Sequence, residues 1–189
     1  FTGDRAGDVL YAALHRAGGS VGLGHLLRTV RAERVGVESD RPFDPMSTVG
    51  PVELRVTDDP AADAARWLAR RLRDAVRRRG SATLAVSGGS SAPPLFDALL
   101  AENVPWEHIT VWQVDERVAT DGHPARNARQ LDPLPCRVEL MAVTDVDLAG
   151  AAHRYAAGLP ERFDVVHLGL GDDGHTASWP PGDPVVDSD

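Results

Sequence analysis

The sequence predicts an α/β fold, in which an open, mostly parallel sheet carries helices on both of its faces. From residue 52 onward, short apolar runs typical of strands alternate with longer segments that have helical periodicity. Each strand–helix–strand step favours a right-handed crossover, which makes the neighbouring strands parallel. Ligands of such sheets bind at the carboxyl ends of the strands. We therefore expect a site in the loops that follow the strands.

The first strand and helix are expected within residues 52–80. Residues 52–56, VELRV, alternate between apolar and polar as a strand does. In residues 58–79 one helical face carries only apolar side chains, which are Ala61, Ala65, Leu68, Leu72 and Val76. Acidic residues come early, arginines come late and Gly80 follows, which is the pattern of a helix that ends at this glycine.

The later elements continue the alternation. Strands are expected at residues 82–86, 109–115, 137–141 and 164–170, and helices at residues 94–103 and 147–159. Proline is tolerated in the first turn of a helix, so Pro94 does not argue against the first of these helices. His167, on the last strand, is expected to pack in the core.

Residues 1–45 differ from the rest because they are rich in turn residues and have little strand signal. Residues 4–18 predict one amphipathic helix. Residues 1–18 also resemble a fragment of a family-five uracil-DNA glycosylase, whose neighbouring motifs are missing. We interpret residues 1–45 as an N-terminal appendage, such as a read-through or fusion remnant, and residues 46–189 as the α/β domain.

Composition excludes several classes of function. The formal net charge of −8 argues against a nucleic-acid-binding surface. Cys136 is the single cysteine, so no internal disulfide forms and a cytoplasmic setting is expected. No apolar run approaches the length of about 18 residues that a membrane span needs, and the seven histidines show no zinc spacing. We expect no metal, no membrane association and a monomer.

The last predicted strand leads into a loop that matches G-x-G-x-x-G over residues 169–174. This pattern binds dinucleotides when a helix N-terminus approaches the pyrophosphate. Here Asp172 and Asp173 would repel a diphosphate, and Pro180 and Pro181 would end any helix that follows. We therefore expect no nicotinamide cofactor at this loop.

The same loop offers a general base. Asp173 precedes His175 by two residues, and Gly174 between them permits a sharp turn. A histidine takes a proton from water near neutral pH, and a neighbouring carboxylate orients its ring. The alternative is a loop histidine without a role.

Two further loops carry polar chemistry at strand ends. Residues 87–91, SGGSS, open a helix, so their amides and hydroxyls suit a phosphate monoester; the alternative is a turn without a ligand. In the loop at residues 115–127, Arg117 is expected to clamp the phosphate and Asp115 to face the reacting carbon. The alternative for Arg117 is a surface salt bridge.

In order and spacing, AVSGGSSAP, WQVDERVATDGHPARN and VVHLGLGDDGHTASWPPG resemble the signature segments of the 6-phosphogluconolactonases, in the glucosamine-6-phosphate isomerase/6-phosphogluconolactonase family. The resemblance covers residues 52–189. It implies a glucosamine-6-phosphate isomerase-like sheet and no cofactor. It also implies hydrolysis of 6-phospho-D-glucono-1,5-lactone to 6-phosphogluconate, a step of the oxidative pentose phosphate pathway.

The resemblance also assigns roles to residues. His175 would be the base, with Asp173 beside it, and Asn127 matches the asparagine of a Ser-Asn pair in which Arg126 replaces the serine. The substrate's phosphate and sugar would be held by Ser87, Gly88, Gly89, Ser90 and Arg117. The family's C-terminal portion, with a further basic phosphate contact, does not appear, so the chain is interpreted as C-terminally truncated.

Two other functions remain open. One is an amino-sugar phosphate isomerase or deaminase of this family. Such enzymes have sequences similar to Asp-Glu-Tyr in the second segment and Gly-His-Ile-Ala-Phe-Asn in the third, whereas this chain has Arg117 in place of the tyrosine and Ser178 in place of the phenylalanine. A non-catalytic sugar-phosphate-binding effector domain would keep the phosphate loop but would need no base, and the Asp-Gly-His segment argues against it.

Overall fold

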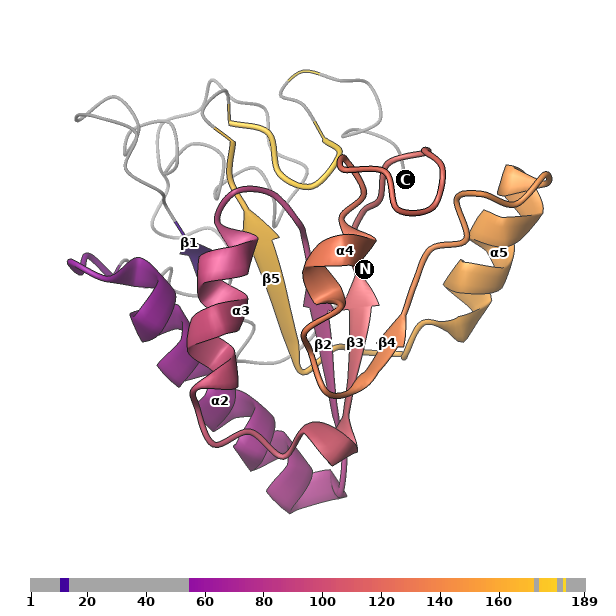
Figure 1. The fold of residues 1–189 in the computed structure, drawn as a ribbon. Helices are drawn as coiled ribbons and strands as arrows, with labels where there is room; N and C mark the ends of the chain where they lie inside the picture. Colours follow the sequence, from indigo (N-terminus) through magenta and orange to yellow (C-terminus); the bar gives the residue numbers. More distant parts are fainter. Residues whose placement is uncertain (1–10, 14–54, 172–173, 180–181, 183–189) are drawn as a thin grey trace.

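The computed structural model describes residues 11–13, 55–171, 174–179 and 182 (Figure 1). Its elements follow in the order β1 (Tyr11–Ala13), α2 (Pro60–Arg79), β2 (Ala82–Val86), α3 (Ala92–Leu100), the 3-10 helix η1 (Trp106–His108), β3 (Ile109–Gln113), α4 (Ala128–Leu131), β4 (Arg137–Glu139), α5 (Leu148–Gly158) and β5 (Val165–Gly169).

The strands form one parallel sheet in the order β1-β5-β2-β3-β4. From β2 the chain steps outward to β3 and β4, and then returns to the other side of β2 to form β5. The strand order therefore reverses between β2 and β5, and open α/β sheets bind ligands in the crevice at such a point. The arrowheads of β2, β3 and β5 point to the same edge of the sheet (Figure 1).

Helix α2 forms where the sequence predicts it, and both of its ends are capped. The side chain of Asp59 accepts a hydrogen bond from the Ala62 N–H at 3.0 Å, and Pro60 occupies the first turn. Gly80 ends the helix with a φ of 79°, a left-handed conformation that favours glycine. The local signals and the packed structure agree at both ends.

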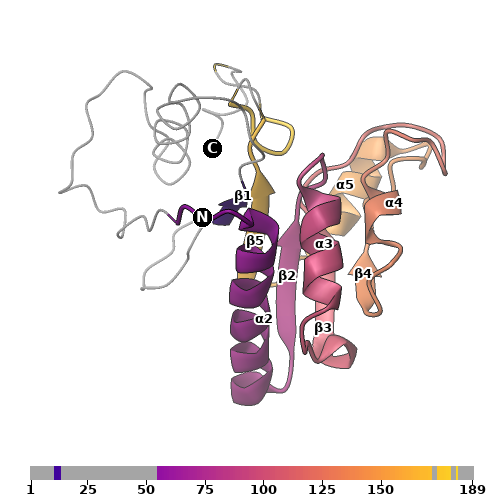
Figure 2. The ribbon, with the colours of Figure 1, turned by 60° about the vertical axis from the view of Figure 1, so that its left-hand side comes forward.

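Helices cover both faces of the sheet, as predicted. Helices α2 and α3 lie side by side (Figure 2) and bury a cluster that includes Leu68, Leu72, Leu84, Leu95, Leu99 and Val111. Trp112 points to the opposite face because it alternates with Val111 along β3. There it meets Tyr155 of α5, with ring centroids 5.4 Å apart, and the Tyr155 hydroxyl donates to the Gln113 carbonyl at 2.7 Å.

Several expectations from the sequence need correction. Strand β4 ends at Glu139 and not at residue 141, and helix α3 spans Ala92–Leu100 and not residues 94–103. Residues 55–56 form no strand, and residues 52–54 lie outside the described residues. Tyr11–Ala13 is a strand paired with β5, not part of a helix. The reason is tertiary, since the edge of β5 away from β2 offers backbone groups to pair with. Strand β3 ends at Gln113, two residues before the predicted end.

The proposed boundary between residues 45 and 46 lies outside the described residues, as does most of the glycosylase-like segment, and both stay predictions. Among the described residues, no helix combines the length and the apolar character that crossing a bilayer requires.

Candidate active site

The loops after β2, β3 and β5 line one pocket of about 330 Å³ at the carboxyl edge of the sheet. The sequence-predicted site residues that line it are Ser87, Gly88, Gly89, Ser90, Asp115, Arg117, Asn127 and His175. Asp173 lies outside the described residues. Three segments far apart in the sequence therefore meet, as the rule for strand ends leads us to expect.

The serine-glycine loop connects β2 to α3 and is tied to β5. The buried Ser87 donates its backbone N–H to the His167 carbonyl at 3.0 Å, and its side-chain oxygen accepts from the Gly169 N–H at 2.7 Å. Gly89 has a φ of 103°, which favours glycine. Backbone amides of a loop that opens a helix suit an anion such as a phosphate.

The loop after β3 brings Asp115, Arg117 and Asn127 together. The Arg117 guanidinium donates to Asn127 Oδ1, and Asn127 Nδ2 donates to the Asp115 carbonyl at 3.2 Å. Within the part of the chain that the structure describes, Arg117 has no carboxylate partner, so the surface salt bridge considered as an alternative does not form there. An arginine whose partner among the described side chains is an amide is suited to pair with an anionic ligand.

The loop after β5 reverses sharply to present His175. The Gly171 N–H donates to the His175 carbonyl at 2.8 Å, and the Gly174 N–H donates to the Gly171 carbonyl at 2.9 Å. Gly174 has a φ of 88°, so the glycine supplies the turn that the sequence predicts. The half-buried His175 thus lies in the same pocket as the serine-glycine loop.

A hydrogen bond joins this loop to the one after β3. The Ser178 hydroxyl donates to Asp115 Oδ2 at 3.0 Å, and the Asp115 residue is only 8% exposed. The Thr176 hydroxyl donates to the Gly169 carbonyl at 2.9 Å, which fixes the loop to the end of β5. The acid and the imidazole therefore belong to loops held in register by side-chain bonds.

The structure adds Glu116, an acid of the loop after β3 that the sequence analysis did not select as a site residue. Its buried carboxylate accepts hydrogen bonds from the Gln113 side chain and from the backbone of Arg117, Asn127 and Ala128. Burial by itself raises the pKa of Glu116, but these donors and the Arg126 guanidinium outweigh it and lower the pKa to about 2. The one available signal was an acid between two predicted site residues.

His167 on β5 is fully buried, which confirms the predicted packing role. Neither ring nitrogen has a hydrogen-bond partner, and burial lowers the pKa of His167 to about 4. No group of three potential metal ligands occurs among the residues that the structure describes.

Comparison with known proteins identifies the family. Residues 56–189 match the family model described as Glucosamine-6-phosphate isomerases/6-phosphogluconolactonase. The chain belongs to this family. Two curated relatives named 6-phosphogluconolactonase are similar to it: the Synechocystis sp. protein is 36% identical over 134 residues and the Pseudomonas aeruginosa protein is 38% identical over 141 residues.

The chain spans only part of these family members. The matches cover 61% of this chain and 56% of the Synechocystis protein, and 67% of this chain and 59% of the Pseudomonas aeruginosa protein. A crystal structure of a 6-phosphogluconolactonase from Shewanella baltica has a TM-score of 0.57 at 33% identity and covers 64% of this chain and 56% of that chain. The Thermotoga maritima structure, with a TM-score of 0.59 at 19% identity over 65% of this chain and 61% of that one, supports the fold alone.

Proposed function

We propose that this chain hydrolyses 6-phospho-D-glucono-1,5-lactone to 6-phosphogluconate. The observation that carries the proposal is the convergence of the loops after β2, β3 and β5 on one pocket, which holds an arginine without a carboxylate partner among the described residues and an imidazole. The names of the curated relatives support the choice of reaction.

The phosphate and the lactone ring are bound at different parts of the pocket. Residues 87–90 offer backbone amides and hydroxyls to the phosphate. Arg117 and Asn127 line the same pocket and offer further donors to the substrate. A ligand held in this way presents its carbonyl carbon to His175. Because substrate and water are already held in place when the reaction begins, the attack does not lose the translational and rotational entropy that a bimolecular attack in solution loses.

His175 takes a proton from water as the water oxygen bonds to the lactone carbonyl carbon. The tetrahedral intermediate then breaks its bond from that carbon to the ring oxygen, which receives the proton from the imidazolium. The carboxylic acid that results loses its proton to solvent, which gives the carboxylate and the acid release that can be measured. General-base help of this kind is worth about 10²- to 10⁴-fold. Asp173 would orient the His175 ring, and Asp115, held by Ser178, would face the reacting carbon.

The proposal includes a cytoplasmic setting, a monomeric state and the assignment of residues 46–189 to the lactonase domain. The presence of a single cysteine, which can form no internal disulfide, fits the reducing setting.

The experiment follows acid release from the phospholactone for the wild-type chain, His175→Ala and a control, His153→Ala, whose exposed histidine lies on α5. The same variants are made in a chimera that adds the part of the Pseudomonas aeruginosa relative that this chain does not span. We expect His175→Ala to lower kcat at least about 100-fold and the control to retain full activity. Equal rates for wild type and His175→Ala would show that His175 is not the general base.

Two outcomes would favour the alternatives. Sugar-phosphate binding without turnover in either chain would point to an effector domain. Turnover of glucosamine 6-phosphate in place of the lactone would point to an isomerase or deaminase.

A further inference from the structure

Two of the pocket residues of the loop after β3, Arg117 and Asn127, are anchored to one buried oxygen atom. Oε1 of Glu116 accepts the backbone N–H of Arg117 at 2.8 Å and that of Asn127 at 2.7 Å. The side chains of these two residues bond each other and line the pocket. Although ten positions separate them in sequence, a single acceptor therefore sets where both backbones lie.

The second oxygen ties the same carboxylate to β3 and to α4. Oε2 of Glu116 accepts from Gln113 Nε2 and from the Ala128 N–H, both at 2.9 Å. The side chain has no exposed surface. A buried carboxylate that satisfies several donors at once costs much free energy to disturb, because each donor would lose its partner.

Arg126 also contacts the Glu116 carboxylate, and it does so without lining the pocket. Its Nε lies 3.0 Å from Oε2 of Glu116, and its Nη1 donates to the Ala119 carbonyl at 3.0 Å and to Asp121 Oδ1 at 3.1 Å. The contact with Glu116 raises the pKa of Arg126. Its side chain is only 7% exposed, and Arg126 is not among the residues that line the pocket.

We propose that Glu116, ion-paired with Arg126, is a positioning residue that holds Arg117 and Asn127 at the pocket for substrate binding. This role rests on the proposed function. Neither Glu116 nor Arg126 touches the pocket, so both act through the two residues that do. Loss of the anchor weakens binding of the substrate more than it slows the chemistry at His175, which belongs to another loop.

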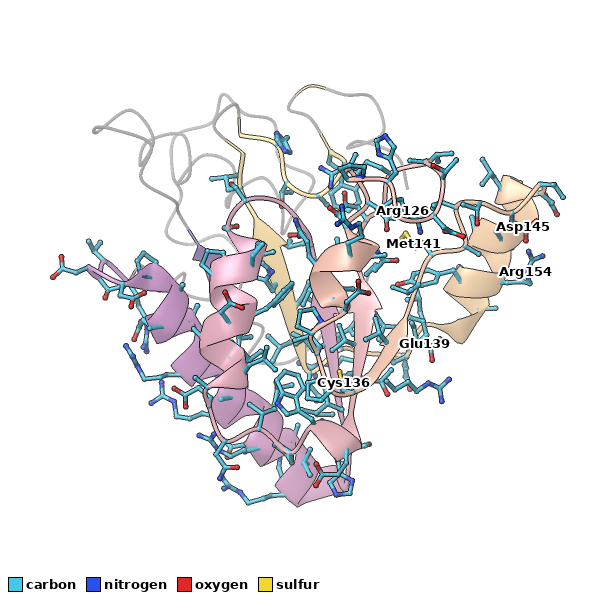
Figure 3. All side chains as sticks on the ribbon, in the orientation of Figure 1. Arg126, Cys136, Glu139, Met141, Asp145 and Arg154 are labelled. Atoms are coloured by element: carbon cyan, nitrogen blue, oxygen red, sulfur yellow. The ribbon has the colours of Figure 1, made fainter. Side chains whose placement is uncertain are left out.

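The primary test is Glu116→Gln, which keeps the shape of the side chain and removes its charge. We expect KM for the phospholactone to rise about tenfold while kcat stays within about threefold of wild type, since binding contacts act on ground and transition states alike. Asp145→Asn is the matched control. Asp145 also accepts a backbone N–H and pairs with an arginine, Arg154, but the pair lies at α5 (Figure 3), and KM should not change.

A second pair of variants leaves the carboxylate in place, in case Glu116→Gln does not fold. Arg126→Met removes the ion pair and should also raise KM, whereas Arg126→Lys, which keeps a positive charge beside Glu116, should lose less. Unchanged KM in both Glu116→Gln and Arg126→Met would overturn the proposal.

A double-mutant cycle tests whether Glu116 acts through Arg117. If it does, Glu116→Gln raises KM by a smaller factor when it is added to Arg117→Ala than it does in the wild-type background, because only the contact through Asn127 is then left to lose. Fully multiplicative effects of the two substitutions would show an independent role and overturn the positioning role.

Amide hydrogen exchange gives a readout that needs no substrate. In Glu116→Gln the amides of Arg117, Asn127 and Ala128 should exchange faster than in wild type, and those of β2 should not. Unchanged exchange at the three amides overturns the proposal. This arm decides the positioning role even if the wild-type chain and the chimera leave the lactone intact, a result that counts against the proposed function alone.

Discussion

Gly88 and Asn127 are in such close contact that position 88 has no room for a side chain. A Cβ at Gly88 would lie 2.1 Å from Asn127 Oδ1 and 2.3 Å from its Cγ. Asn127 cannot easily withdraw, because its amide group bonds Arg117 and the Asp115 carbonyl. The Asn127 side chain therefore occupies the space that a side chain at position 88 would need, and this contact joins the loops after β2 and β3, both of which line the pocket.

Gly88→Ala should separate these two loops. The added methyl group must displace Asn127, so we expect affinity for 6-phosphogluconate to fall about tenfold or more and the free energy of unfolding to fall by about 1–3 kcal/mol. Calorimetric titration and chemical denaturation measure the two effects. Gly158→Ala is the control, because a Cβ there would lie 3.4 Å from the nearest Trp112 atom. Wild-type affinity in Gly88→Ala would contradict this close-approach account.

Arg117→Ala should raise KM for the phospholactone more than it lowers kcat. The phosphate is bound equally in the ground state and the transition state, so its loss appears in KM. Steady-state kinetics make the distinction, with Arg129→Ala, an exposed arginine on α4, as the control. A fall in kcat with KM unchanged would mean that Arg117 contacts the reacting carbonyl and not the phosphate.

The fold was largely predictable because its signals are local. For helix α2 the sequence predicts an apolar stripe, late arginines and a terminal glycine. In the structure Gly80 ends the helix, the last turn carries arginines, and Ala65, Leu68 and Leu72 of the stripe are buried. Strand β1 was not predictable, because Tyr11–Ala13 pairs with β5 through backbone groups that any short segment offers. Residues 55–56 alternate like a strand but pair with no other strand within the described residues, and only tertiary structure decides this.

The sequence predicted the residues that line the candidate site but not Glu116, the buried residue that holds two of them in place. The strand-end rule brings His175, Arg117 and Ser87 to one edge without knowledge of any side-chain contact. Glu116 escaped prediction because its partners include the backbone N–H groups of Asn127 and Ala128, which a loop of unknown path brings back to it. In the sequence the two acids are simply neighbours. In the structure Asp115 lines the pocket, whereas the Glu116 side chain is fully buried and does not line it.

Ser87→Ala should lower the stability of the fold, whereas Ser90→Ala should weaken ligand binding with little change in stability. Ser87 is buried and its oxygen accepts from the Gly169 N–H at 2.7 Å, so its loss leaves a donor unpaired and lowers the free energy of unfolding by about 1–3 kcal/mol. Ser90 is an exposed residue that lines the pocket, so its loss should weaken sugar-phosphate binding with little change in stability. Denaturation and calorimetric titration of both variants measure this contrast, and equal stability losses would contradict it.

His167→Leu should remove an acid sensitivity of the fold. Burial lowers the pKa of His167 from 6.5 to about 4, so the unfolded chain binds this proton more readily than the folded chain does. The contribution of the neutral ring is therefore complete above pH 6.5 and is lost as the pH falls toward 4, an effect of about 3 kcal/mol.

Leucine has a similar volume and leaves no unpaired ring nitrogens in the core, so His167→Leu should match or exceed wild-type stability at pH 7 and lose less of it between pH 6.5 and pH 4. Urea denaturation at a series of pH values measures the difference, with the exposed His153→Leu as the control. Parallel stability curves for wild type and His167→Leu would mean that folding does not lower the pKa of His167, which would contradict this account.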